Sequence, residues 1–123
     1  MNTPYKLLII DDNKEVLTAI TDFLSKKKYD VVSASDGLDG LKLLEMERKK
    51  FDLVITDLVM PNISGVGIIS IIKKKFPELP VIAITGWGEY PEALATEAQA
   101  NRVLEKPFDL SELETVIMEL LSA

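Results

Sequence analysis

The sequence contains no cysteine and no histidine. Their absence excludes disulfide bonds, cysteine nucleophiles, Cys/His zinc sites and every catalytic triad that uses an imidazole. Basic residues are also in the minority: 14 lysines and arginines face 20 aspartates and glutamates, which gives a formal net charge of −6. A chain this acidic is poorly suited to binding the phosphates of nucleic acids. Its chemistry must therefore depend on carboxylates, hydroxyls, lysines or a metal ion bound by oxygen.

Long hydrophobic runs are missing as well. The first apolar run, Leu7–Ile10, ends at two aspartates, so it is too short for a signal peptide or a membrane span. The sequence also lacks Gly/Ser-rich linkers, low-complexity stretches and internal repeats. Its 123 residues, 47% of them hydrophobic and 28% charged, predict one globular domain over residues 1–123. We expect this domain to be cytoplasmic.

Short apolar runs alternate with segments of helical periodicity. The runs predicted as strands are Tyr5–Ile10, Asp30–Ala34, Asp52–Thr56, Pro80–Ile84 and Arg102–Leu104. The segments predicted as helices are Lys14–Lys27, Leu38–Glu47, Gly65–Lys75, Pro91–Ala98 and Leu110–Leu121. Continuous apolarity in the strands indicates a parallel sheet that is covered on both faces. We therefore predict a doubly wound α/β fold, a three-layer α/β/α sandwich around five strands.

Polar residues follow the strands at the point where each strand ends. Asp11 and Asp12 follow the first, Asp57 the third, Thr85 the fourth and Lys106 the fifth. Ligands of open α/β sheets bind outside the carboxyl ends of the strands, so we expect these side chains to converge. Asp12 has two candidate roles: it can cap the following helix or bind a metal ion, and the two roles are compatible.

Clustered aspartates point to a particular chemistry. Carboxylates packed together repel one another, and a divalent cation removes that repulsion. Oxygen ligands without histidine favour a hard ion, and Mg²⁺ is preferred because the chain has no 12-residue calcium loop. One carboxylate is then free to attack phosphorus, while a lysine and a hydroxyl neutralise the phosphoryl oxygens. The pattern predicts Mg²⁺-dependent phosphoryl transfer to an aspartate.

These motifs together resemble the receiver domain of two-component response regulators, over essentially the whole chain. The segments that carry the resemblance are Asp11-Asp12, Asp57-Leu58-Val59-Met60-Pro61 with Gly65, Thr85-Gly86 and Lys106-Pro107-Phe108. Gly65 alone could be a plain turn residue. The resemblance implies the strand order 2-1-3-4-5 and a cis peptide bond between Lys106 and Pro107.

The resemblance also implies roles for the matching residues. Asp57 would accept a phosphoryl group from a sensor histidine kinase or a histidine phosphotransfer protein. Lys106 would pair with the acyl phosphate, and Thr85 would swing toward it. The implied Mg²⁺ ligands are Asp11, Asp12, Asp57 and the backbone carbonyl of Val59. A downstream protein target or a second copy would bind the face made by the fourth helix, the fifth strand and the fifth helix.

Three residues, Val103, Val59 and Trp87, affect how we expect the switch and the loss of the phosphoryl group to proceed. Many receivers carry tyrosine or phenylalanine where this chain has Val103, so we expect signalling to depend on backbone and loop movement instead. Val59 and Trp87 occupy the positions that flank the path of hydrolytic water in this family. Both side chains are apolar and could not orient water, which predicts slow self-dephosphorylation.

A phosphoaccepting receiver would modify itself and would not turn over a substrate. Two alternatives to it remain open. One is a Mg²⁺-dependent phosphohydrolase of the haloacid-dehalogenase type, which also uses an aspartate nucleophile. That class needs a second aspartate two residues after the nucleophile, where this chain has Val59. The other is a degenerate receiver-like scaffold that is not phosphorylated.

Overall fold

The computed structural model describes residues 4–46, 50–58, 60, 65–86 and 99–122. Its elements are, in chain order, β1 (Lys6–Ile10), α1 (Lys14–Lys26), β2 (Asp30–Ala34), α2 (Gly37–Met46), β3 (Leu53–Asp57), α3 (Gly65–Lys75), β4 (Val81–Thr85), β5 (Arg102–Glu105) and α5 (Leu110–Leu121). All neighbouring strands are parallel, and their order is β2-β1-β3-β4-β5. The predicted five-stranded parallel sheet and its strand order are therefore confirmed.

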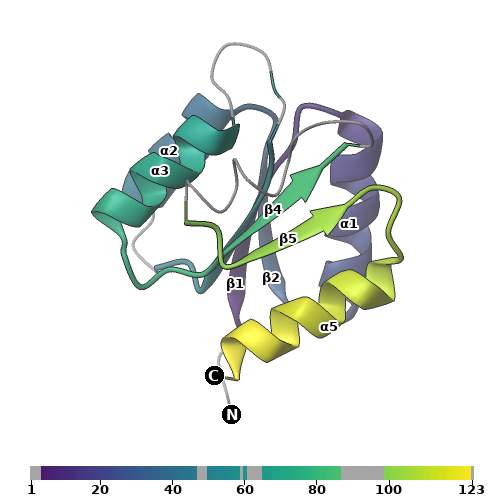
Figure 1. The fold of residues 1–123 in the computed structure, drawn as a ribbon. Coiled ribbons are helices and arrows are strands. Elements are labelled where there is room, and N and C mark those ends of the chain that lie inside the picture. The colour runs from purple at the N-terminus through teal and green to yellow at the C-terminus, as the bar shows by residue number, and fades with distance from the viewer. Residues whose placement is uncertain (1–3, 47–49, 59, 61–64, 87–98, 123) are drawn as a thin grey trace.

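Helices cover both faces of this sheet, with α2 and α3 on one side and α1 and α5 on the other (Figure 1). Alternate residues of each strand point to opposite faces, so every strand feeds two cores. On the α2/α3 side, Leu8 and Val54 pack with Ile68 of α3. On the α1/α5 side, Ile9 and Ile55 pack with other fully buried side chains of both helices. The predicted three-layer sandwich is confirmed.

Among the described residues, element boundaries differ from the predictions by at most one residue. The strands predicted to begin at Tyr5, Asp52 and Pro80 each begin one residue later. Proline has no N–H to give to a ladder. Asp52 is bound to Lys6 just before β3: its backbone N–H donates to the Lys6 carbonyl at 2.7 Å, and its side chain accepts a hydrogen bond from the Lys6 N–H at 2.7 Å. The predicted helix Pro91–Ala98 lies outside the described residues. Of the helices that the structure describes, none combines the length and apolarity that a membrane span requires.

Helix starts show one clear correction. The residue that caps α1 is Asn13 and not Asp12: its side-chain oxygen accepts hydrogen bonds from the backbone N–H groups of Glu15 and Val16. Helix α2 is capped by Asp36, which accepts a hydrogen bond from the N–H of Asp39 at 2.8 Å. An N-cap must have extended backbone angles directly before the first helical residue, and Asn13 holds that place with φ −85° and ψ 109°.

Candidate functional site

Three aspartates meet at the carboxyl edge of the sheet, as the sequence predicts. Asp11 directly follows β1, and Asp57 is the last residue of β3, the neighbouring central strand. Each of Asp11, Asp12 and Asp57 offers a carboxylate oxygen, and these oxygens lie within 4.8 Å of one another. Asp11 and Asp57 are buried, whereas Asp12 is exposed. The cluster therefore opens to solvent on the side of Asp12.

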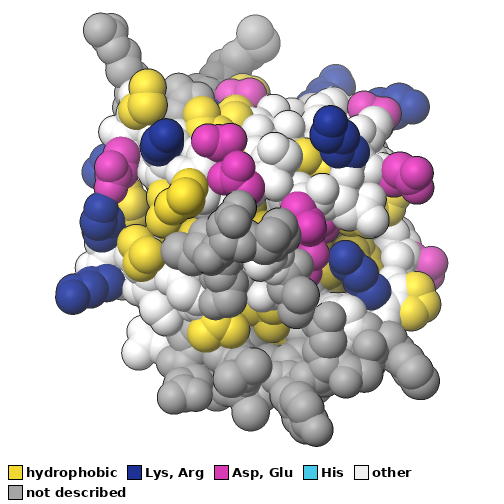
Figure 2. All heavy atoms as spheres, turned by 90° about the horizontal axis from the view of Figure 1, so that it is seen from above, with side chains coloured by type: hydrophobic (Ala, Val, Ile, Leu, Met, Phe, Trp, Pro, Cys, Tyr) yellow, Lys and Arg dark blue, Asp and Glu magenta, His cyan; other side chains and the backbone are white. Residues whose placement is uncertain are grey.

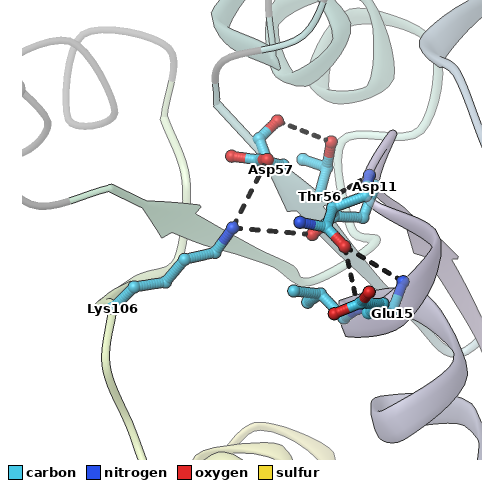
Figure 3. A network of polar contacts seen from close by, with 7 residues as sticks. Asp11, Glu15, Thr56, Asp57 and Lys106 are labelled. Carbon is cyan, nitrogen blue, oxygen red and sulfur yellow. Dashed lines mark hydrogen bonds and ion pairs between the residues drawn. The ribbon is translucent and has the colours of Figure 1, made fainter.

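Lys106 completes the cluster from the end of β5. Its Nζ lies 3.6 Å from Oδ2 of Asp57 and 3.8 Å from Oδ2 of Asp11, so the ammonium bridges the two buried carboxylates (Figure 3). The Lys106 side chain is 31% exposed. The peptide bond between Lys106 and Pro107 is cis, which confirms the prediction made for it. Acidic side chains gather on this surface when the molecule is seen from above (Figure 2).

Asp11 is the most constrained of these acids. Its Oδ1 accepts a hydrogen bond from the backbone N–H of Asn13 at 2.9 Å, while its buried Oδ2 accepts none from the residues that the structure describes. Burial raises the pKa of Asp11 above its ordinary value of 3.8, and the Asn13 hydrogen bond and the Lys106 ammonium oppose that rise. One lone-pair-bearing oxygen of a buried acid is thus left facing the cluster.

The set of donors fits a hard divalent ion. All three candidate side-chain ligands are carboxylates, and an ion would coordinate Oδ2 of Asp11, which has the Lys106 ammonium 3.8 Å away but no hydrogen-bond partner among the described residues. Mg²⁺ commonly uses one or two carboxylates and keeps several waters, which the exposed side of Asp12 would admit. Val59, the fourth predicted ligand, lies outside the described residues.

Thr85 ends β4 beside the cluster. In the β3–β4 register Asp57 pairs with Ile84, so Thr85 comes one residue beyond that pair. The residue is fully buried, and its Oγ1 has no hydrogen-bond partner among the described residues. Its carbonyl accepts a hydrogen bond from the backbone N–H of Lys106 at 2.8 Å, which ties the ends of β4 and β5 together.

The two remaining predicted positions differ in what can be said of them. Val103 lies in β5, is partly buried and packs against the core on the α2/α3 side. It pairs with Ala83 of β4, two residues before Thr85. Trp87 lies outside the part of the chain that the structure describes.

Two supporting residues were not identified as such from the sequence. The Thr56 hydroxyl donates to the backbone carbonyl of Asp57 at 3.1 Å. Gly65 packs against the same peptide: its N–H donates to the carbonyl of Leu58 at 2.9 Å, and a Cβ built on it would overlap with backbone atoms of Asp57 and Leu58. Gly65 is therefore more than a turn residue, because the absence of a side chain lets the start of α3 contact the backbone of Asp57 and Leu58.

Comparisons with known proteins agree with this arrangement. The family model described as "Response regulator receiver domain" matches residues 7–118. The transcriptional regulatory protein GlrR of Escherichia coli is 37% identical over 119 residues, which are 96% of this chain and 26% of that protein. The regulatory protein PhoP of Bacillus subtilis, described as controlling alkaline phosphatase synthesis, is 28% identical over 94% of this chain and 48% of its own length. The chain therefore spans about a quarter to a half of these curated relatives, which are regulators of transcription.

Solved structures agree as well. A receiver domain protein from Clostridium thermocellum is 34% identical and superposes with a TM-score of 0.89, covering 96% of this chain and 94% of that one. A putative response regulator from Chloroflexus aurantiacus is 27% identical with a TM-score of 0.91, covering 98% and 100%. With the family match, the strand order and the acidic edge in agreement, the chain belongs to the receiver domain family of two-component response regulators.

Proposed function

We propose that Asp57 is the phosphoacceptor of this receiver domain. The observation that carries the proposal is the position of the Lys106 ammonium, 3.6 Å from Oδ2 of Asp57, at the open edge of a carboxylate cluster. A nucleophilic carboxylate beside a fixed cation can attack phosphorus while the cation offsets the charge that develops on the phosphoryl oxygens. The donor is a sensor histidine kinase or a histidine phosphotransfer protein, because this chain has no histidine of its own.

The transfer exchanges one bond to phosphorus for another. An oxygen of Asp57 forms a P–O bond, the P–N bond of the donor phosphohistidine breaks, and the released imidazole takes up a proton. Since little covalent chemistry is required of the protein, its contribution is positioning and charge stabilisation. Lys106 provides the cation, and the hydroxyl of Thr85 can donate to a phosphoryl oxygen once one is present.

We propose that this cluster binds Mg²⁺, which Asp11, Asp12, Asp57 and the carbonyl of Val59 would hold. When bound, Mg²⁺ neutralises charge on the carboxylates and on the phosphoryl group. Asp11 would use Oδ2, its oxygen without a hydrogen bond, and Asp12 would bind from the exposed side. The chain thus promotes only its own phosphorylation and dephosphorylation.

Phosphorylation would then change which proteins the domain binds. Thr85 has a buried hydroxyl without a partner among the described residues, and turning it toward a new phosphoryl group would move the end of β4. Val103 is too small to act as an aromatic reporter, so the backbone would carry the change. Val59 and Trp87 keep their proposed part in slowing hydrolysis. The target would be a downstream protein or a second copy that binds near β5 and α5.

The proposal extends to the domain and its location. We take residues 1–123 as one receiver domain that acts in the cytoplasm, because relatives such as GlrR and PhoP are bacterial regulators of transcription. Neither the phosphohydrolase nor the scaffold alternative has an observation in its favour. A direct test separates all three.

The test is incubation of the protein with acetyl phosphate and Mg²⁺, followed by intact mass measurement. We expect a mass increase of one phosphoryl group in the wild type and none in Asp57→Asn or after chelation of Mg²⁺. Asp52→Asn is the matched control, because Asp52 lies at the opposite end of β3 and serves the Lys6 backbone. Continuous phosphate release would support the phosphohydrolase, and an unchanged wild-type mass would support the scaffold.

A further inference from the structure

In the turn between β1 and α1, Asn13 forms hydrogen bonds through both its side chain and its backbone. The side-chain Oδ1 of Asn13 accepts hydrogen bonds from the backbone N–H groups of Glu15 at 3.0 Å and Val16 at 3.2 Å, which caps α1. The backbone N–H of the same residue donates to Oδ1 of Asp11 at 2.9 Å. One residue therefore closes the first turn of a helix and holds a buried carboxylate.

Holding one oxygen of Asp11 determines where the other one points. Oδ1 is occupied by the Asn13 N–H, and Oδ2 lies 3.8 Å from Nζ of Lys106 and has no hydrogen bond within the described part of the chain. A rotation of the carboxylate would break the bond to Asn13, a charge-assisted hydrogen bond of the strong kind. Asp11 and the start of α1 at Glu15 lie together on one side of the cluster, opposite Lys106 (Figure 3).

We propose that Asn13 is a positioning residue for the cation site, because its cap fixes the turn that aims Oδ2 of Asp11 at the other carboxylates. The inference rests on the proposed function, since the cation is the Mg²⁺ of that site. Asn13 acts through Asp11 and is not itself a ligand. Groups that orient a metal ligand affect metal affinity strongly even though they never touch the ion.

Two consequences follow from a shared turn. Loss of the cap should weaken Mg²⁺ binding, and Mg²⁺ binding should in return hold the first turn of α1 more firmly, because coupling between two equilibria is reciprocal. The second effect is visible at the N–H groups of Glu15 and Val16, which the cap protects. An asparagine that only stabilised the helix would produce neither effect.

Helix α2 offers a matched control. Asp36 caps α2 by accepting a hydrogen bond from the N–H of Asp39, as Asn13 caps α1. Over the described residues, the acids close enough to share an ion are Asp11, Asp12 and Asp57, and Asp36 is not among them. Asp36→Ala therefore removes a cap of the same kind without touching the cluster. The charge it removes is screened over about 8 Å at physiological ionic strength.

The experiment is isothermal titration of the full chain with MgCl₂ at physiological ionic strength. We expect Asn13→Ala to weaken Mg²⁺ binding about 10-fold, the lower end of the effect seen when a group that orients a metal ligand is removed. Asn13→Ser retains a capping oxygen and should bind within about twofold of the wild type. Asp36→Ala should also remain within about twofold, although it loses a comparable amount of stability.

Amide hydrogen exchange provides a readout that needs no variant. Mg²⁺ should slow exchange at Glu15 and Val16 of the wild type, and it should leave exchange at Asp39 unchanged. Equal Mg²⁺ affinity of Asn13→Ala and the wild type would overturn the inference, as would an equal loss in Asp36→Ala or unchanged exchange in α1. If the wild type itself binds no Mg²⁺, the failure lies with the proposed function instead.

Discussion

The two ends of the central strands both carry buried charged residues, but they treat them differently. At the amino end, Lys6 is 6% exposed, its N–H donates to Asp52, and its ammonium lies 4.7 Å from the centre of the Phe51 ring. At the carboxyl end, Asp11 is 1% exposed and has an oxygen that accepts no hydrogen bond from any described residue. The buried lysine at the first end has partners for both its N–H and its ammonium, whereas the buried acid at the second end has an oxygen that could still accept a bond.

This difference separates structural charges from functional ones. A buried polar group without a hydrogen bond destabilises a fold, whereas a satisfied one is close to neutral or favourable. Three buried side-chain polar atoms lack a hydrogen-bond partner among the described residues: Oδ2 of Asp11 and Oγ1 of Thr85, both at the carboxyl edge, and the hydroxyl of Thr21 in α1. The unfavourable arrangement is concentrated where a ligand would relieve it. Three predictions test this contrast.

The largest expected effect compares the two lysines. Lys106→Met should slow phosphorylation by acetyl phosphate about 100-fold, because it removes a fixed cation that stabilises the transferred group. Lys6→Met should leave the rate within about twofold. It should instead lower the free energy of unfolding by about 1 kcal/mol through loss of the contact with the Phe51 ring. Phosphorylation kinetics by intact mass and urea unfolding measure the two effects, and an equal loss of rate in both variants would refute the contrast.

The second prediction concerns two glycines that touch different kinds of atoms. Gly65→Ala should lower the free energy of unfolding by about 3 kcal/mol, because the new Cβ would overlap with the backbone of Asp57 and Leu58, which cannot move aside. Gly40→Ala should cost less than about 1 kcal/mol. Its Cβ would overlap with Cδ1 and Cγ1 of the Ile10 side chain, which can shift more readily than backbone, and alanine in a helix regains about 1 kcal/mol.

Chemical denaturation of both variants gives these energies. Gly65→Ala should also slow phosphorylation, since the shifted backbone carries the acceptor. A Gly65→Ala variant as stable as Gly40→Ala would show that the backbone of β3 yields more easily than its packing indicates.

The smallest effect is the pH dependence of Asp11. Because burial raises its pKa in the folded protein, the folded state binds a proton more readily than the unfolded state, and stability falls as pH rises from 3.8 through the raised pKa. Above that range without Mg²⁺, Asp11→Asn should be more stable than the wild type by about 1 kcal/mol. The difference should shrink as the pH is lowered toward 3.8.

Thermal or urea unfolding of the two proteins across this pH range tests the prediction. Asparagine can still accept the hydrogen bond from Asn13, so the comparison isolates the charge. If the wild type is more stable than Asp11→Asn at neutral pH without Mg²⁺, then the buried charge of Asp11 does not destabilise the fold and this prediction is wrong.

The fold was predictable because its signals are local and repeated. Apolar runs such as Leu7–Ile10 and Leu53–Ile55 give buried parallel strands, and the parallel arrangement by itself brings Asp11 and Asp57 to one edge. The motif around Asp57 and Lys106 then identified the family that the comparisons confirm. The strand order came from that resemblance and not from periodicity.

The details that depend on three-dimensional contact were not predictable in this way. Asp12 and Asn13 are both good capping residues, and only the backbone course shows that Asn13 does the capping. Gly65 lies close to the backbone of Asp57 in the fold. The number of residues between them in the sequence does not predict this contact. Which oxygen of Asp11 lacks a hydrogen bond is likewise a property of the folded turn.

The hydrogen bond from the Lys106 N–H to the Thr85 carbonyl has a mechanical consequence. It couples the end of β4 to the residue that follows β5, because a shift of one backbone would stretch the hydrogen bond to the other. A pull on the ammonium of Lys106 would reach the carbonyl of Thr85 through the Lys106 side chain, its backbone N–H and this one hydrogen bond. Coupling through this hydrogen bond would require no large side chain at Val103.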